Sequence, residues 1–436
     1  MKNRIGIRLE DKNPWERRVA LTPEDAAKLI SRGLDLTVEP FDRRAFPDQA
    51  YAEAGARISH EAVDADLVIG IKEMPTDLFK AGKAYLFFSH TIKGQPYNMD
   101  MLRRLMDLSC TLFDYETITD EGGQRLVAFG RHAGLAGMVD TLWTLGHRLV
   151  ALGHPTPLSE LRPTHEYADA TEAMAAVARA GEALLAEASW PAEITPLVIG
   201  ITGYGRVAGG AWEILEHLPH TKVSPDALEA RVAEGRREIL AVEFREEHLV
   251  EPHAPDESFD LQDYYTRGKE GYTSILDQHL PHLTVLVNGI YWEERFPRLA
   301  GVKVLRKLFH GASPRLLAVG DISCDVDGSL ACTVRDTMPG DPVYVYDPHT
   351  GDAPSGLVAE GLAVMAVTNL PTELPVDASR AFSQALTPLI PGLADADLSA
   401  ATVEEAGLPG PMQRAAILWR GQLTAPYAYM AEFLTE

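Results

Sequence analysis

The sequence predicts an α/β protein made of two units, each built on a doubly wound parallel sheet, with a cleft between them. Short runs rich in apolar and β-branched residues alternate along the chain with longer segments of helical pattern. The alternation begins again after a connector near the middle of the 436 residues. A glycine-rich turn in the second half joins a strand pattern directly to a helix pattern.

The first half of the chain opens with a strand pattern at 4–10, followed by a helix pattern at 21–33. Thr22 suits the N-cap of this helix, Pro23 suits its first position and Gly33 its end. Further strand patterns lie at 34–40, 65–73, 84–90 and 110–116. Strands that alternate with helices favour a parallel sheet covered on both faces.

A long helix pattern at about 134–152 leads into a connector at 153–167, which contains proline and histidine and is a candidate boundary between domains. The second half continues with a helix at 171–188, a strand–turn–helix at 194–218, strands at 283–292, 315–323, 343–348 and 362–371, and a mostly helical tail at 373–436. Ligands of open parallel sheets bind at the carboxyl ends of the strands, so the candidate site residues are sought there.

Composition narrows the class of function. Lys and Arg number 40 against 63 Asp and Glu, and the net charge of −23 argues against a general nucleic-acid surface. The most apolar long stretch, 134–153, carries Asp140, His147 and Arg148, which indicates a buried helix and no membrane span. The N-terminus lacks the apolar core of a signal peptide. The three cysteines form neither a disulfide framework nor a zinc pattern, so we expect no metal and a cytoplasmic location.

The glycine turn ITGYGRVAGGA places Gly203, Gly205 and Ala208 in a G-x-G-x-x-A arrangement after an apolar strand. Gly203 would allow the tight turn, Gly205 would let the backbone reach a pyrophosphate, and Ala208 would let the helix pack closely on the strand. The alternative is a packing turn that binds no nucleotide. The strand and helix on either side favour a Rossmann-like dinucleotide site.

The choice of nicotinamide cofactor depends on the next strand end. An acidic residue about twenty positions after the glycines is usual for NAD, because it holds the ribose hydroxyls. Here Ser224 takes that position and Asp226 lies beyond a proline, while Lys222 and Arg206 are available for a 2′-phosphate. The pattern favours NADP(H) over NAD(H).

Two further strand patterns end in groups that carry protons. ADLVIGIKE ends at Lys72 and Glu73, and AYLFFSH ends at His90. If these strands are neighbours, both side chains emerge at the same edge of the sheet. A histidine titrates near neutrality and desolvation lowers the pKa of a lysine, so the pair suits proton exchange at a carbonyl or imine carbon. Alternatively, His90 is structural and Lys72 pairs with Glu73.

Charged residues near the same edge complete the candidates. Arg17 and Arg18 are able to bind carboxylates through paired hydrogen bonds, although adjacent arginines are usually solvated surface charges. Glu116 ends a further strand and would hold an ammonium group or pair with one of these arginines. Asp321 ends a strand of the second unit.

In this order, the motifs resemble the lysine–2-oxoglutarate reductase domain of aminoadipic semialdehyde synthase, a saccharopine dehydrogenase of the lysine-forming type. The matching stretches are EDKNPWERRVALTP, IGIKEMP, AYLFFSHTIKGQPYNM, LFDYE, LVAFGRHAGLAGM, LVNGIYWE, AVGDISCDVDGS and TNLPTELP. The wider superfamily includes alanine dehydrogenase and the nucleotide-binding part of transhydrogenase. The resemblance covers most of the chain, and we expect a free-standing reductase.

The resemblance implies roles residue by residue. Lys72 and His90 match the acid–base pair of the family, and Arg18 matches the arginine that binds a substrate carboxylate. Substrate-binding positions are implied at Glu16, Gln95, Glu116, Arg125 and Phe129. Cofactor-binding positions are implied at Gly203, Gly205, Arg206, Val207, Ser224, Asn288, Gly289, Tyr291, Asp321, Ile322, Asn369 and Leu370.

The family is discontinuous, which implies a catalytic domain at 1–133 plus 374–436 and a dinucleotide-binding domain at 134–373. The implied reaction is the condensation of L-lysine with 2-oxoglutarate to saccharopine at the expense of NAD(P)H. An enzyme of the alanine dehydrogenase type, which uses ammonia and a 2-oxo acid, and a non-catalytic nucleotide-binding module are the alternatives. The expected partners are these small molecules, with no nucleic acid and no membrane, and the sequence leaves a homo-oligomer open.

Overall fold

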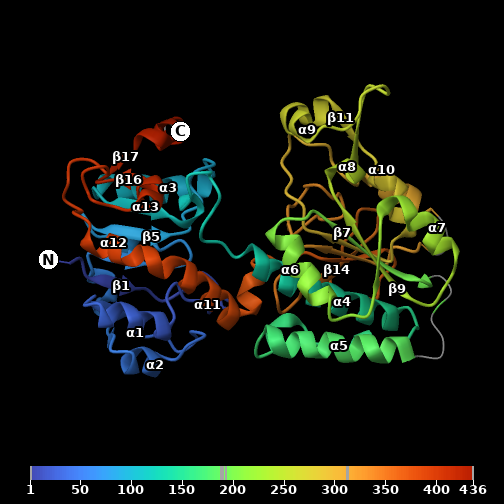
Figure 1. Cartoon of the computed structure of the whole chain (residues 1–436), viewed down its shortest axis with the longest axis horizontal. Helices are drawn as coiled ribbons and strands as arrows, with labels where there is room; N and C mark the ends of the chain where they lie inside the picture. The colour runs from blue at the N-terminus through green and yellow to red at the C-terminus, as the bar shows by residue number, and fades with distance from the viewer. Residues whose placement is uncertain (1, 187–190, 192–193, 311–313, 435–436) are drawn as a thin grey trace. The chain divides into compact units, whose positions relative to one another are not determined.

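The chain divides into two compact units. The computed structural model describes residues 2–186, 191, 194–310 and 314–434 (Figure 1). The first unit combines Met1–Phe129 with Pro375–Glu436, and the second is the continuous stretch Gly130–Leu374. Residues 187–188 of the expected helix lie outside the described residues. The functional assignment of the two domains stays a prediction.

The first unit is built on one sheet of eight strands in the order β17-β16-β6-β5-β4-β1-β2-β3. The strands are β1 (Ile5–Ile7), β2 (Leu36–Val38), β3 (Arg57–Ile58), β4 (Leu67–Ile69), β5 (Ala84–Phe87), β6 (Thr111–Asp114), β16 (Ala416–Trp419) and β17 (Gln422–Leu423). The helices are α1 (Pro23–Ser31), α2 (Asp48–Glu53), α3 (Pro96–Asp107), α11 (Pro375–Leu386), α12 (Ile390–Asp395) and α13 (Gly410–Ala415). β1 to β6 pair in parallel, whereas β16 is antiparallel to β6 and β17.

The second unit has a sheet of seven strands in the order β14-β15-β13-β12-β7-β9-β8. Its strands are β7 (Leu197–Thr202), β8 (Thr221–Val223), β9 (Ile239–Phe244), β12 (Val285–Asn288), β13 (Ala318–Asp321), β14 (Val343–Tyr346) and β15 (Leu362–Met365), with a separate antiparallel pair, β10 (Val250–Pro252) and β11 (Tyr272–Ser274). The helices are α4 (Gly130–Ala151), α5 (Ala170–Ala186), α6 (Arg206–Leu215), α7 (Leu228–Ala233), α8 (Glu246–Leu249), α9 (Leu261–Arg267) and α10 (Val302–Leu308). Among the described strands of this sheet, the edge strand β14 alone runs antiparallel.

The predicted α/β class is therefore confirmed, with two sheets that are mainly parallel. The local signals for α1 are confirmed as well. The Thr22 side chain accepts a hydrogen bond from the Asp25 backbone N–H at 3.4 Å, Pro23 is the first helical residue, and Gly33 adopts a φ of +81°. A left-handed residue suits glycine because glycine has no Cβ atom.

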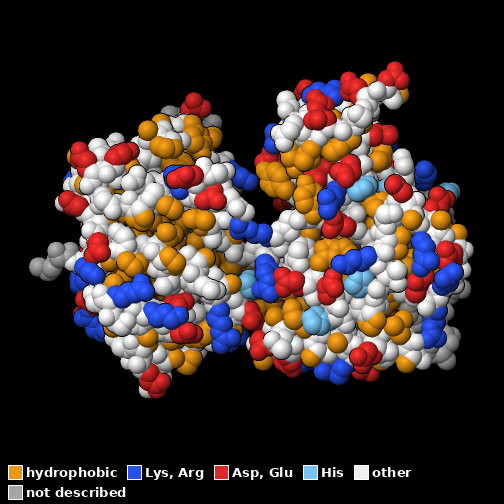
Figure 2. Space-filling view, viewed as in Figure 1, with side chains coloured by type: hydrophobic (Ala, Val, Ile, Leu, Met, Phe, Trp, Pro, Cys, Tyr) orange, Lys and Arg blue, Asp and Glu red, His pale blue; other side chains and the backbone are white. Residues whose placement is uncertain are grey.

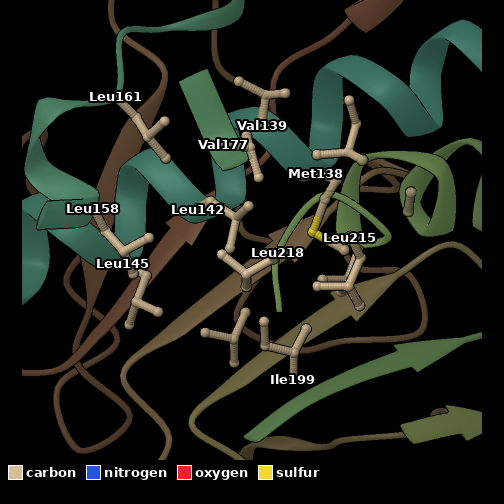
Figure 3. Close-up of a cluster of buried hydrophobic side chains, with 14 of the residues drawn as sticks. Met138, Val139, Leu142, Leu145, Leu158, Leu161, Val177, Ile199, Leu215 and Leu218 are labelled. Atoms are coloured by element: carbon tan, nitrogen blue, oxygen red, sulfur yellow. The ribbon is translucent and has the colours of Figure 1, made fainter. Parts of the chain in front are cut away.

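One expectation about connections is wrong, and a second is incomplete. The stretch 153–167 is no domain boundary, because it lies inside the second unit and its Leu158 and Leu161 join the core with Leu142 and Leu145 of α4 (Figure 3). The tail is mostly helical, as expected, but it also contains β16 and β17, which extend the first sheet. The buried run at β16 is four residues long, too short for a helix pattern to be told from a strand pattern.

α4 and α6 pack at backbone distance, because glycines line their contact. A Cβ atom on Gly134 would lie 1.9 Å from the Val207 carbonyl oxygen, and one on Gly210 would lie 2.0 Å from the Arg131 carbonyl oxygen. Any side chain at either position would therefore push the helices apart. This contact fixes the helix that follows the glycine turn.

One face of the molecule carries charged side chains of both signs. Figure 2 shows Lys and Arg side chains scattered among Asp and Glu over the face in view. Across the described ranges, no helix combines the length and the apolar character that crossing a bilayer requires.

Candidate functional site

Lys72 and His90 follow adjacent strands of the first unit. β4 and β5 are parallel neighbours, with Ile69 opposite Leu86. Their carboxyl ends therefore meet at one edge of the sheet, and the chain continues from them to Lys72 and to His90, as the sequence predicts. His90 adopts a φ of +49°, a conformation that non-glycine residues adopt mainly where the surrounding structure enforces it.

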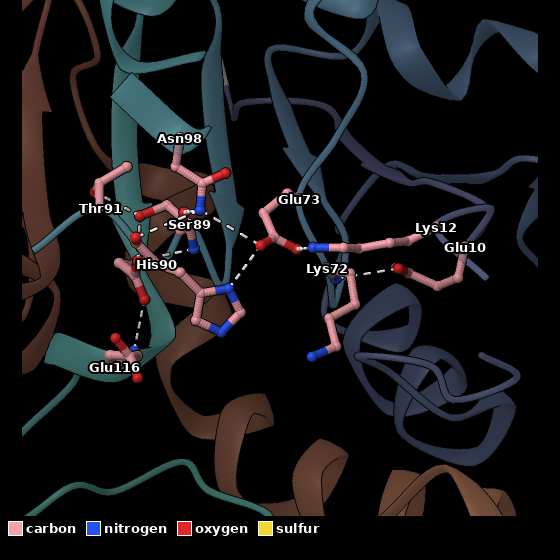
Figure 4. A network of polar contacts seen from close by, with 10 residues as sticks. Glu10, Lys12, Lys72, Glu73, Ser89, His90, Thr91, Asn98 and Glu116 are labelled. Carbon is pink, nitrogen blue, oxygen red and sulfur yellow. Dashed lines mark hydrogen bonds and ion pairs between the residues drawn. The ribbon is translucent and has the colours of Figure 1, made fainter. Parts of the chain in front are cut away.

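Glu73 connects the two elements. One oxygen of its carboxylate lies 2.7 Å from Nδ1 of His90, and the other accepts a hydrogen bond from Nζ of Lys12 at 2.5 Å (Figure 4). Burial opposes the charge of Glu73, but the bonds from His90 and Lys12 outweigh it and hold the pKa of Glu73 at about 2. Glu73 is thus an anion that orients the imidazole of His90.

The amine of Lys72 is left out of this ion pair, so the alternative in which Lys72 simply pairs with Glu73 is wrong. Among the described residues, Nζ of Lys72 has no hydrogen bond or ion pair. Burial, and then the positive charge of Arg18, lowers the pKa of Lys72 from its ordinary 10.5 to about 8, against the attraction of Glu16 and Glu73. A lysine with this pKa exchanges protons near neutral pH.

Glu10 fixes the backbone that carries Lys72. Its carboxylate oxygens accept hydrogen bonds from the backbone N–H groups of Ile71 at 2.5 Å and Lys72 at 3.1 Å. Burial and the neighbouring charge of Glu16 nevertheless raise the pKa of Glu10 to about 8. The loop after β4 is therefore held by a buried carboxyl group.

A second buried carboxyl group holds the loop after β5. Asp114, at the end of β6, accepts hydrogen bonds from the backbone N–H of Ser89 at 2.8 Å and from its hydroxyl group. Asn98 donates to the Ser89 carbonyl oxygen at 2.9 Å. Burial raises the pKa of Asp114 to about 6 despite these bonds. These contacts fix Ser89, the residue that directly precedes His90.

Arg18 is buried beside Lys72, and two of its five side-chain N–H donors bind Glu16. Nε and Nη2 of Arg18 donate to the two Glu16 oxygens at 2.8 and 2.6 Å. The guanidinium lies 4.1 Å from the ring centre of Phe129, which stacks on Phe382 at 4.5 Å. Among the described residues, this arrangement leaves Nη1 and the second N–H of Nη2 to bind a substrate carboxylate, whereas Arg17 is exposed and donates to a backbone carbonyl.

The other predicted substrate residues lie on neighbouring segments of the first unit. Glu116 pairs with Arg125 at 3.4 Å, and not with Arg17 or Arg18. Gln95 precedes α3, and its buried side-chain oxygen has no hydrogen-bond partner in the described structure. An orphaned acceptor of this kind suits an ammonium or amide donor of a ligand.

The glycine turn of the second unit fits a pyrophosphate. Gly203 has a φ of +88° and passes close to Gly289 and Ile290, where an added Cβ atom would lie 3.1 Å from the nearest heavy atom. At Gly205 an added Cβ atom would meet nothing within 4 Å, so the backbone is open to a ligand. α6 begins at Arg206, and its N-terminal N–H groups favour an anion there.

The carboxyl ends of β7, β12 and β13 are tied together by buried polar side chains. The Thr202 hydroxyl donates to Oδ1 of Asn288 at 2.8 Å, and Nδ2 of Asn288 donates to Oδ1 of Asp321 at 2.9 Å. Asp321 also accepts bonds from Ser323 and Thr333. Asn288 and Asp321 are fully buried, so their side chains brace the strand ends.

Three of the predicted cofactor residues meet in one pocket of about 480 Å³. Ile322, Asn369 and Leu370 line it together with Ala133 of α4 and Cys324. Asn369 has a left-handed backbone, with a φ of +60°. In the part of the chain that the structure describes, no group of His, Cys, Asp and Glu side chains is placed to hold a metal ion.

Ser224 does not lie where the sequence places it. It follows β8, but β9 separates β8 from β7, so Ser224 ends a strand two places from the glycine turn. Lys222 pairs with Glu216 at 2.6 Å. The expectation assumed that the next strand in sequence would be the next strand in space.

Two other predicted cofactor residues lie near the glycine turn and at the surface. Val207 packs close to Gly289, while Tyr291 is 64% exposed.

The sequence interpretation missed the residues that support the proton-carrying pair. Glu73 was considered only as a partner of Lys72, and Lys12, Glu10 and Asn98 were not considered. The sequence does contain a signal for Glu73. It directly follows Lys72 after β4, and an acid at this place lies within reach of His90, which follows the neighbouring strand β5. Glu10 is distant in sequence from the loop that it holds, and no local pattern marks the bond of Asn98 to Ser89.

The chain is similar in sequence to known protein families and to individual relatives. Residues 6–136 match the alanine dehydrogenase/PNT N-terminal domain, and residues 295–426 match the alanine dehydrogenase/PNT C-terminal domain. The chain is 36% identical to alpha-aminoadipic semialdehyde synthase of Arabidopsis thaliana and 33% identical to the mitochondrial enzyme of Mus musculus. These alignments cover 98% of this chain, but 41% and 47% of the relatives, so the chain spans less than half of their length.

A relative of similar length is saccharopine dehydrogenase [NAD(+), L-lysine-forming] of Yarrowia lipolytica, which is 28% identical over 88% of this chain and 90% of its own. Among solved structures, an L-alanine dehydrogenase superposes with a TM-score of 0.62 at 17% identity, covering 99% of this chain and 100% of that one. The transhydrogenase of Sinorhizobium meliloti gives 0.55 at 15% identity, covering 96% and 99%. These two structures show a shared fold.

Proposed function

This chain belongs to the alanine dehydrogenase/PNT family of oxidoreductases, and on that premise we propose that it condenses L-lysine with 2-oxoglutarate to saccharopine, using NAD(P)H. Similarity to semialdehyde synthases and to lysine-forming saccharopine dehydrogenases over most of the chain supports the choice of substrates. The observation that carries the proposal is the arrangement of Lys72 and His90 around Glu73.

The reaction needs a neutral amine, because an ammonium group has no lone pair to attack a keto carbon. The pKa of Lys72, lowered to about 8, leaves part of its amine neutral near pH 7.5, where it accepts a proton from the substrate ammonium. His90, oriented by Glu73, donates a proton to the carbinolamine hydroxyl so that water leaves. Nη1 of Arg18 binds a carboxylate of the oxoglutarate part, and the amide oxygen of Gln95 accepts from a substrate ammonium group.

The glycine turn around Gly203 and Gly205 and the pocket at Ile322, Asn369 and Leu370 would hold the dinucleotide. When bound, the nicotinamide supplies the hydride that reduces the iminium carbon. The braces at Asn288 and Asp321 keep the strand ends in place for it.

The test is oxidation of NADPH and NADH, followed at 340 nm, with lysine and 2-oxoglutarate. We expect lysine-dependent turnover, and we expect His90→Gln to lower kcat by about 10² to 10⁴ while nucleotide binding persists. His60→Gln, a change of an exposed histidine in the same unit, serves as the matched control. Turnover with ammonia and a 2-oxo acid in place of lysine would assign the alanine dehydrogenase type of reaction instead.

The cellular setting is part of the same proposal. Cys110, Cys324 and Cys332 are all free thiols, which supports a reducing compartment such as the cytoplasm.

A further inference from the structure

The order of strands in the second sheet determines which strand end lies beside the glycine turn, and therefore which side chains would meet the adenosine ribose. In a Rossmann-like unit, the side chains at the end of the strand beside the glycine turn meet the ribose, and they distinguish a 2′-hydroxyl from a 2′-phosphate. That strand is usually the next one in sequence. Here the neighbour of β7 is β9, whereas β8 lies at the edge of the sheet.

The contact between β9 and the glycine turn is direct. β9 pairs with β7 along its whole length, ending with Thr202 opposite Phe244. The N–H of Gly203 donates to the carbonyl oxygen of Phe244 at 2.8 Å. The residues on either side of Phe244 therefore border the turn, while Ser224 and Lys222 do not.

Three side chains meet at this strand end. Glu243 and Arg245 flank the buried Phe244, and Nε of Arg245 donates to Oε1 of Glu243 at 2.8 Å. The Arg245 guanidinium lies 5.0 Å from the ring centre of Tyr204, the residue between the two glycines of the turn. Tyr204 is 47% exposed, so an exposed cation stacks on an exposed ring beside the open backbone.

We propose that Arg245 binds the 2′-phosphate of NADP(H) and so determines the preference of this chain for that cofactor. The inference rests on the proposed use of a nicotinamide dinucleotide and adds to it the residue that selects among such cofactors. Glu243 is a positioning residue, since it binds Nε of Arg245 and leaves Nη1 and Nη2 available for the phosphate.

Three features favour a phosphate over a ribose hydroxyl. Among the described residues, Nη1 and Nη2 of Arg245 have no hydrogen-bond partner, and a guanidinium edge matches phosphate oxygens in pairs. The negative charge of Glu243 is already compensated by its ion pair with Arg245. A second acid nearby, Glu246, accepts a hydrogen bond from the Tyr265 hydroxyl at 3.0 Å and is buried, so it does not take the place of a ribose ligand.

The test measures binding without turnover, by titrating the unaltered chain, Arg245→Gln and Lys222→Gln with NADPH and with NADH. Lys222 is the matched control, because it is another exposed cation of the same sheet that is held by one glutamate, but it lies on β8. We expect Arg245→Gln to raise the Kd for NADPH by about 10- to 100-fold and that for NADH by about twofold or less. Lys222→Gln should change neither.

A second probe locates the effect at the phosphate. Adenosine 2′,5′-bisphosphate should displace NADPH from the unaltered chain and bind Arg245→Gln about 10- to 100-fold more weakly, whereas adenosine 5′-monophosphate should bind both alike. Equal losses for NADPH and NADH in Arg245→Gln, or a selective loss in Lys222→Gln, would overturn the inference. Selective binding through Arg245 without any lysine-dependent turnover would instead refute only the proposed reaction.

Discussion

Replacing Lys72 by methionine should make the protein more stable while it loses its activity. Below pH 8 the folded state holds a protonated amine in a place that disfavours charge, because burial and Arg18 lower the pKa of Lys72 to about 8. The difference from the ordinary value of 10.5 corresponds to about 3 kcal/mol of unfolding free energy. Methionine keeps the apolar stem and carries no charge, so we expect Lys72→Met to gain about 2–3 kcal/mol at pH 7.

The sign of the effect fixes its dependence on pH. The unfolded chain binds the proton up to pH 10.5 and the folded chain only up to about pH 8, so the stability of the unaltered protein rises between these values. The advantage of Lys72→Met should be complete below pH 8 and should disappear as the pH approaches 10.5.

Urea unfolding of both proteins at pH 7 and at pH 10 measures this difference. Lys303→Met, on the exposed side of α10, is the control and should change the unfolding free energy by about 0.5 kcal/mol or less at either pH. If Lys72→Met were less stable than the parent protein at pH 7, or if its advantage grew with pH, the amine would not be held in a place that disfavours charge. The lowered pKa that supports the proposed role of Lys72 as a base would then be contradicted.

Three other changes test other parts of the structure. Glu73→Gln removes the anion that orients His90, and kcat for lysine-dependent turnover should fall about 10-fold or more. Burial, and then its neighbour Asp140, raises the pKa of Glu373 well above its usual range, so the folded protein binds a proton that the unfolded chain releases above its ordinary pKa. The Tm should therefore fall between pH 5.5 and pH 8. In thermal melts over this range, Glu373→Gln should show a smaller fall in Tm. Gly134→Ala places a methyl group against the Val207 carbonyl and should cost about 1–3 kcal/mol in urea unfolding, whereas Gly209→Ala, where a Cβ atom meets nothing within 4 Å, should gain about 0.5–1 kcal/mol. A stabilised Gly134→Ala would contradict the close contact of α4 and α6.

The sequence predicts the positions of Lys72 and His90 because they depend only on local patterns and on one geometric rule. Each ends an apolar run, and parallel strands present their carboxyl ends at the same edge. Thr22 and Gly203 are predictable for the same reason, since a cap or a turn is decided by a few adjacent residues.

The features that the sequence does not predict depend on which distant segments meet. The prediction that Ser224 lies beside the glycine turn is wrong, because the order of strands along the sequence does not determine their order in the sheet. β16 was missed because a short buried run is compatible with either kind of element. The hydrogen bonds of Glu10 to the loop of Lys72 join positions about sixty residues apart, and no local pattern marks them.

The return of Pro375–Glu436 to the first unit has a consequence for synthesis on the ribosome. Phe382, Leu386 and Ile390 share one core with β1 and β4, and β16 covers the edge of β6. The N-terminal segment therefore emerges without part of its core and waits while Gly130–Leu374 is translated, which takes about 10 to 50 seconds. During that interval the continuous unit is able to fold first, and the unfinished edge of β6 is where a nascent chain would aggregate or recruit a chaperone.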